Sequence, residues 1–146
     1  RLFSGPVDGL GRRAIYTKIT IMEPPRLLAL FNQPAPKIPT GKRDVTNTPA
    51  QSLALLNDPT VRELASFWGK RMAARPAESL ADRIRTCFDA ALSRPAREQE
   101  IQQWTVMVHD LASLHRVAPE SIMTSEAVWT DVAHTLFNLK EFIYVR

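Results

Sequence analysis

Apolar and polar positions follow two different periods along the chain. From Ile15 every second residue is isoleucine or threonine as far as Ile21, and this alternation predicts a strand over residues 13–21. From Arg26 onward, apolar residues recur every three or four positions, which predicts amphipathic helices. The first eleven residues hold three of the chain's five glycines, so we expect a loop leading into the fold.

Six segments carry the helical period, and most have recognisable start or stop signals. They are residues 26–32, a segment capped by Thr48 that reaches Leu56, one capped by Asp58 and closed by Pro76, one capped by Ser79 and broken at Arg94-Pro95, residues 96–115 and residues 125–137. Helices therefore account for most of the predicted structure.

Three residues mark the start of the second helix. Thr48 supplies a hydroxyl at the N-cap, Pro49 occupies the first helical position, and Gln51 is placed to accept from the N–H of Thr48. This spacing is a capping box. Because alanine and leucine occupy most positions from Ala50 to Leu56, we expect this helix to be buried on most sides and central.

The segments around the helices complete the predicted fold. Three prolines and Gly41 make residues 33–42 an irregular, extended loop. The apolar tail 142–145 is expected to pair with the strand near Ile15. The predicted fold class is therefore mainly α, an orthogonal bundle of five or six helices with a small two-stranded β ladder.

Length and composition are those of one globular domain. We expect a single domain over 1–146, with the leading loop and strand at 1–23 and a helical body at 24–146. No stretch approaches the ~20 apolar residues of a membrane span. Residue 1 is arginine rather than methionine, so we expect the chain to be part of a longer, multi-domain protein.

Positive charge is concentrated in the first half of the chain. Residues 1–76 hold 12 Lys and Arg against 5 Asp and Glu, whereas residues 77–146 hold 7 against 10. The candidate basic face consists of Arg12, Arg13, Lys18 and Arg26, with Lys37, Lys42 and Arg43 as further members. Nucleic-acid binding is one interpretation, but no nucleic-acid motif is present, and a solvated surface or a face towards an acidic neighbouring domain is favoured.

Residues with catalytic or metal-binding chemistry are few. His109 and His115 stand six residues apart, about 240° around a helix, so they cannot ligate one metal from that helix. Cys87 lies in mid-helix, where we expect a buried hydrophobic thiol rather than a nucleophile. Glu98 and Glu100 fall in the first turn of a helix, where the macrodipole explains them. We assign no catalytic, cofactor-binding or metal residue.

The densest polar cluster beside apolar residues is the best candidate for a site or a fold anchor. It comprises Arg43, Thr46, Asn47, Thr48, Gln51, Asn57 and Asp58. Capping of two successive helices explains Thr48, Gln51 and Asp58, and the asparagines can bond turn backbone. A structural role is therefore favoured over a ligand site.

The runs 46–51 (Thr-Asn-Thr-Pro-Ala-Gln) and 55–59 (Leu-Leu-Asn-Asp-Pro) resemble a planctomycete-specific domain of unknown function. Further anchors are Arg12-Arg13, Arg94-Pro95 and the run 137–142. The chain departs from the family at Asn32, where members often have aspartate, and at Pro39, where they often have cysteine. The resemblance names no catalytic residue.

The resemblance implies a C-terminal module of large exported, or periplasmic, proteins whose preceding part often carries a c-type cytochrome domain. Any c-type haem would then lie upstream, with no cofactor in this chain, and the partners would be the upstream domains of the same polypeptide. We expect a non-catalytic structural or interaction module. The alternatives are a ligand-binding or catalytic part of a polysaccharide-processing system, and binding of an anionic polymer or nucleic acid.

Overall fold

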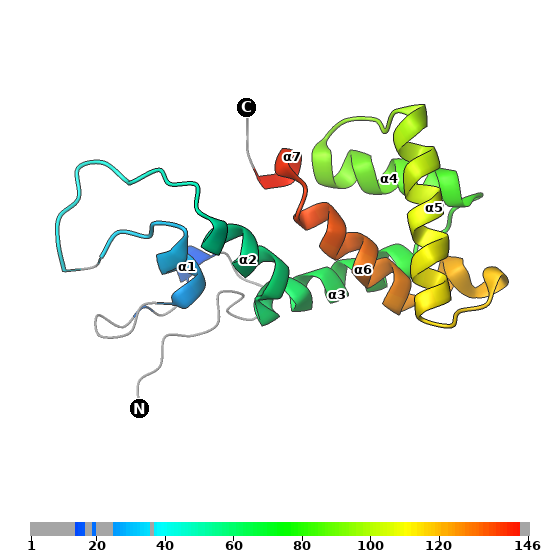
Figure 1. Ribbon diagram of the computed structural model, residues 1–146, viewed down its shortest axis with the longest axis horizontal. Helices are drawn as coiled ribbons and strands as arrows, with labels where there is room; N and C mark the ends of the chain where they lie inside the picture. Colours follow the sequence, from blue (N-terminus) through cyan, green and yellow to red (C-terminus); the bar gives the residue numbers. More distant parts are fainter. Residues whose placement is uncertain (1–13, 17–18, 20–24, 36, 144–146) are drawn as a thin grey trace. The chain divides into compact units, whose positions relative to one another are not determined.

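The computed structural model describes residues 14–16, 19, 25–35 and 37–143, and helices dominate this part of the chain (Figure 1). They are η1 (Ala14–Tyr16), α1 (Arg26–Leu30), α2 (Pro49–Asn57), α3 (Pro59–Ala74), α4 (Leu80–Leu92), α5 (Glu98–Leu114), η2 (Pro119–Thr124), α6 (Glu126–Phe137) and α7 (Lys140–Ile143). No helix among these residues is long and apolar enough to cross a membrane. The mainly helical prediction is confirmed.

The chain divides into two compact units, residues 1–60 and residues 61–146. In the first unit, α1 and α2 contact each other. The capping box predicted at Thr48 is present: the Thr48 N–H donates to Gln51 Oε1 at 3.0 Å, and Pro49 begins the helix. Asp58 accepts from the Thr60 N–H at 2.8 Å, as its predicted role at the start of α3 requires.

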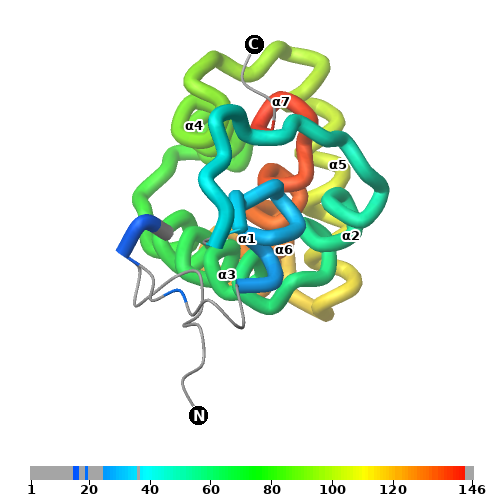
Figure 2. The backbone as a smooth tube through the Cα atoms, turned by 90° about the vertical axis from the view of Figure 1, so that its left-hand side faces the viewer, coloured from blue at the N-terminus to red at the C-terminus, as the bar shows by residue number. Residues whose placement is uncertain are grey.

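The second unit holds the hydrophobic core. Helix α5 packs against α4, η2 and α6, and α7 returns from the end of α6 to contact α4 (Figures 1 and 2). The largest fully buried side chains come from α4, α5 and α6: Trp129, Phe88, Ile84, Leu136, Val108, Val128, Val132 and Cys87. The apolar stripes predicted for these helices therefore face one another.

One glycine sets how closely two helices of this core approach. A Cβ on Gly69 of α3 would lie 2.5 Å from the backbone nitrogen of Thr130 in α6. That distance is too short for any side chain, so only glycine allows the two backbones to approach this closely. Gly69 is correspondingly buried.

The predicted β ladder is not found among the described residues. Residues 14–16 form a 3₁₀ turn, and Phe142 and Ile143 belong to α7, where both backbone N–H groups donate to the Leu139 carbonyl. Phe142 stacks on Phe137 with ring centroids 5.0 Å apart, so the apolar tail covers the end of α6 instead of extending. Ile19 has no strand assignment, and the rest of the predicted strand and tail lies outside the described residues.

Two further predictions need correction, and one helix was not predicted. The prediction that α2 is buried and central is wrong, since Leu53 is 58% and Leu56 is 53% exposed. Residues 33–42 are irregular but not wholly extended, because the Ile38 N–H donates to the Ala35 carbonyl and closes a turn. The short helix η2, which Pro119 opens, lies between the predicted helices 96–115 and 125–137, where the sequence predicted no helix.

Candidate functional site

The C-terminus of α1 presents three carbonyls that the helix itself does not use. The Gln33 N–H donates to the Leu28 carbonyl and the Asn32 N–H to that of Ala29, the paired bonds of a Schellman ending. Asn32 adopts the left-handed conformation this ending requires, with φ of 59°. Asparagine tolerates this region better than most residues, which accounts for its position here.

Arg43 binds two of the three remaining carbonyls. Its Nε donates to the Asn32 carbonyl at 3.0 Å, and its Nη2 donates to that of Phe31. A guanidinium presents its donors in a rigid fork, which suits two successive backbone oxygens. Its positive charge also lies at a helix C-terminus, where the partial charge is negative.

Gln51 binds the third carbonyl and joins α1 to the start of α2. Its Nε2 donates to the Leu30 carbonyl and to Thr46 Oγ1, each at 3.0 Å, while its Oε1 caps α2 at Thr48. Thr46 Oγ1 is also bonded to the side-chain amide of Asn32, whose Nδ2 lies 2.8 Å away. We refer to Asn32, Arg43, Thr46 and Gln51 as the polar clamp.

Gln51 is the most buried member of the polar clamp. Gln51 is only 7% exposed, and its amide makes hydrogen bonds in three directions. A buried amide left without partners would cost about 1–3 kcal/mol, so the bonded geometry is strongly preferred. Arg43 is exposed, but its Nε and Nη2 both donate hydrogen bonds to backbone carbonyls.

The remaining candidates also act locally. Asn57 Nδ2 donates to the Leu53 carbonyl of its own helix at 3.0 Å, and Asp58 caps α3. Asn47 and Arg26 are exposed. The other members of the predicted basic face, Arg12, Arg13 and Lys18, lie outside the described residues. Asn57 and Asp58, like the members of the polar clamp, therefore bond backbone groups or neighbouring side chains.

The residues with ordinary catalytic or ligating chemistry are separated. Among the described residues, no group of three His, Cys, Asp or Glu is arranged to hold a metal ion. Cys87 is fully buried, and burial raises the pKa of its thiol to about 12, which leaves it a poor nucleophile. His115 Nε2 lies 2.6 Å from Asp131 Oδ2, a hydrogen bond that joins the end of α5 to α6.

Comparison with known families identifies the family but assigns no function to these residues. Residues 5–108 match the model of the family PSD1, described as protein of unknown function (DUF1553). The chain belongs to this family. The PSD1 match spans the polar clamp and helices α1 to α4, together with most of α5. No curated protein and no solved structure matches the chain.

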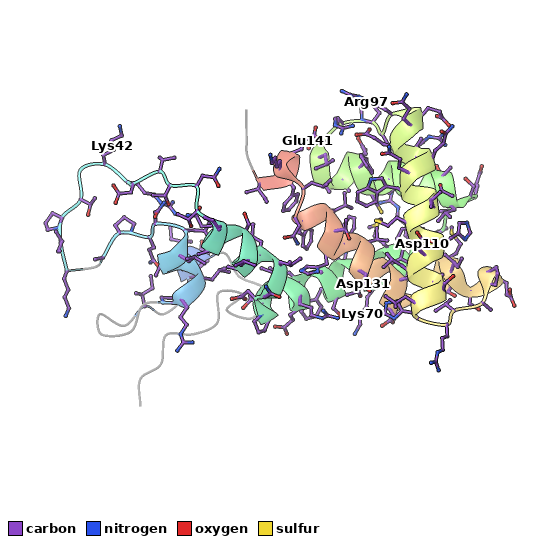
Figure 3. The ribbon with its side chains drawn as sticks, in the orientation of Figure 1. Lys42, Lys70, Arg97, Asp110, Asp131 and Glu141 are labelled. Atoms are coloured by element: carbon purple, nitrogen blue, oxygen red, sulfur yellow. The ribbon has the colours of Figure 1, made fainter. Side chains whose placement is uncertain are left out.

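The structure adds an ion cluster within the second unit that sequence patterns did not predict. Arg94 Nη2 lies 2.7 Å from Glu100 Oε1 and 2.7 Å from Glu141 Oε2, so one guanidinium bridges the start of α5 and α7. Figure 3 labels Glu141 at this end of the unit. The bonds to Arg94 lower the pKa of Glu100 to about 2 and also lower that of Glu141. Glu100 is therefore more than a helix-dipole residue.

The second addition is a buried arginine in α4. Arg83 is 3% exposed; it donates to the carbonyls of Met72 and Arg75 at the end of α3 and to that of Met123 at 2.9 Å. Its guanidinium lies 5.2 Å from the ring centroid of Trp129. Burial lowers the pKa of this guanidinium. The sequence signal was an arginine falling on the apolar stripe of its helix, between Leu80 and Cys87.

Proposed function

We propose that this PSD1-family chain is a non-catalytic helical module that packs against other domains of a longer protein. What supports this most is the polar clamp. The side chains best suited by type to bind a ligand, Arg43 and Gln51, already donate to the three carbonyls at the end of α1. A ligand would have to displace bonds on which the local fold depends.

The resemblance at residues 46–59 supports a finer version of the proposal. We infer that the longer protein is an exported, planctomycete-type protein in which a preceding domain carries c-type haem. This chain contributes no attachment site for that haem, since Cys87 is its only cysteine and a Cys-x-x-Cys-His motif needs two. Its partners would then be the preceding domains of the same polypeptide.

Titration calorimetry of this chain with the preceding part of its natural polypeptide tests the proposal. We expect saturable binding with a dissociation constant in the micromolar range or below. The absence of binding, together with unchanged hydrogen exchange throughout the chain, would contradict the proposal. Arg62→Glu provides a folded control for the binding measurement, because Arg62 is exposed in the first turn of α3, where a negative charge is favourable.

Catalysis or ligand binding at the polar cluster makes a different prediction. If Arg43 served a substrate, Arg43→Lys would abolish binding of that substrate while α1 and α2 kept their hydrogen-exchange protection. The proposed structural role predicts instead that Arg43→Lys lowers hydrogen-exchange protection before any binding is affected. A lysine cannot donate to both carbonyls in the same fork geometry, so protection at the end of α1 should fall first.

A further inference from the structure

The junction between α6 and α7 lacks the residues that usually force a helix to end. Helices α1, α4 and α5 are each followed closely by a residue in the left-handed conformation, Asn32, Ser93 or Arg116. No such residue is found among the described residues between α6 and α7, where Asn138 has φ of −93° and ψ of −1°. Residues 126–143 also contain neither proline nor glycine. Asn138 therefore already lies on the helical side of backbone space.

The apolar pattern of α6 continues without a break into α7. Trp129, Val132, Leu136, Leu139 and Ile143 recur at steps of three and four, so on one uninterrupted helix they would form a single apolar stripe. The first three are buried, and the last two are half-buried. The local sequence therefore favours one helix over residues 126–143, whereas the structure has two.

The side chain of Asn138 takes part in ending α6. Its Nδ2 donates to the His134 carbonyl at 2.8 Å, the acceptor that its own backbone N–H would use in a continuing α-helix. That N–H donates instead to the Thr135 carbonyl at 3.1 Å, and the Leu139 N–H donates to the Leu136 carbonyl, also at 3.1 Å. The last turn of α6 is thus tightened, and one side-chain amide replaces a backbone donor of the helix.

Two side-chain contacts of α7 bind it to the rest of the second unit near the surface. Glu141 accepts from Arg94 Nε at 2.5 Å and from Arg94 Nη2 at 2.7 Å, and Phe142 stacks on Phe137. The Glu141 side chain is 49% exposed and Phe142 is 42% exposed, so solvent screens the ion pair and the stack buries only part of the ring. A helix of one turn does not form by itself in water. These contacts therefore oppose the single helix that the local sequence favours.

We propose that the junction of α6 and α7 is a two-state hinge. In the bent state, which the structure shows, α7 lies against Arg94 and Phe137. In the straight state, residues 126–143 form one helix, and Glu141 and Phe142 leave these two partners. Five residues on a helix turn through about 140° beyond one full turn, so the two phenylalanine rings would then point apart. The hinge therefore controls whether Arg94 and the Phe137 ring are covered.

Nuclear Overhauser contacts measured by NMR on this chain distinguish the two states. A contact between the rings of Phe137 and Phe142 reports the bent state, and a contact from the α-proton of residue 138 to the N–H of Phe142 reports the straight one. Asn138→Ala combined with Glu141→Gln removes the side-chain bond at the junction and the charge that pairs with Arg94. We expect the ring contact to weaken by roughly fivefold or more while the contact from 138 to 142 appears.

A matched double variant provides the control for these changes. Asn57→Ala combined with Glu98→Gln removes an equivalent asparagine bond, to the Leu53 carbonyl, and an exposed ion pair with Arg85. Both reporting contacts should stay as they are in the unaltered chain. In the unaltered chain itself, about 1 M salt should weaken the ring contact in the same direction as the hinge variant, so the test does not depend on the variant alone.

Two results would overturn the hinge. Loss of the ring contact without the new contact from 138 to 142 would mean that α7 frays instead of joining α6. A ring contact that neither the hinge variant nor salt weakens would mean that the bend is fixed. The edge-to-face contact of Phe88 with Trp104, whose ring centroids lie 5.0 Å apart in the core, verifies that the second unit stays folded in each sample.

Discussion

At the scale of single residues, Arg83 is a charged side chain that is buried in the hydrophobic core. Its donors satisfy carbonyls at the end of α3 and near the end of η2, and its face packs on Trp129. Trp129 in turn donates from its indole N–H to the Ile122 carbonyl at 2.9 Å. One guanidinium thus joins four elements of the second unit, α3, α4, η2 and α6.

Replacement of this arginine should cost far more than replacement of an exposed one. Arg83→Met keeps the apolar length of the side chain but removes the donors to three carbonyls, so we expect the free energy of unfolding to fall by about 3 kcal/mol. Arg85→Met is the matched control. Arg85 forms a surface pair with Glu98 at 3.7 Å, and its loss should cost less than about 1 kcal/mol. Equal effects in urea denaturation would contradict the role of Arg83.

The ion pair of Arg94 and Glu100 makes the free energy of unfolding depend on pH in the acidic range. The pKa of Glu100 is lowered from 4.5 to about 2, so its ionised form stabilises the fold above about pH 4.5. That contribution is lost as pH falls through the range between these values. With a quarter of each side chain exposed, we expect at most about 1–2 kcal/mol.

Arg94→Gln should therefore lower stability at pH 7 and have little effect at pH 2. Urea denaturation of the two proteins across this pH range gives the comparison. The two stability curves should converge as acid is added. Parallel curves would show that Arg94 does not act through the carboxylates.

At the scale of secondary-structure elements, close packing of α3 and α6 depends on Gly69. Gly69→Ala places a methyl group against the backbone of Thr130, and overpacking of this kind costs about 1–3 kcal/mol. The better helix propensity of alanine returns up to about 1 kcal/mol. Gly41→Ala is the control, because nothing lies within 4 Å of its Cβ position. A thermal melt should distinguish them; equal melting temperatures would contradict the close approach.

Two variants of Gln51 separate its two functions within the polar clamp. Gln51→Glu keeps the oxygen that caps α2 but loses the donor to the Leu30 carbonyl, whereas Gln51→Ala loses both. Hydrogen exchange at Thr48 should accelerate about fivefold in Gln51→Ala and less in Gln51→Glu, since a cap bond contributes about 1 kcal/mol. Gln102→Ala, exposed on α5, should change neither rate. Unchanged exchange in Gln51→Ala would refute the clamp.

The capping signals were readable from sequence because they are local. The capping bonds between Thr48 and Gln51 and between Ser79 and Asp82 each span three residues, so local spacing is sufficient to place these helix starts. The cluster of Arg94 with Glu141 joins residues 47 apart, and no local pattern encodes such a pairing. A local pattern can also mislead: the alternation from Ile15 to Ile21 predicted a strand, but alternation over a few residues does not decide the local structure.

At the scale of the whole molecule, the sequence predicted a helical fold but not how burial divides along it. Helix α2 has the composition of a buried element, yet composition cannot say which surface will cover it. The structure locates the core in residues 61–146 and leaves Leu53 and Leu56 exposed. The apolar composition of α2 and the exposure of its leucines are consistent with each other if another part of the polypeptide covers this helix.

Amide hydrogen exchange in α1 and α2 tests most directly whether the first unit is a docking module. The amides of Asn32, Gln33 and Asp58 would be compared in this chain alone and in the longer natural polypeptide. We predict exchange at least tenfold slower in the longer polypeptide, with unchanged rates for buried amides of α5 and α6. Equal rates for α1 and α2 in both proteins would contradict the proposed function.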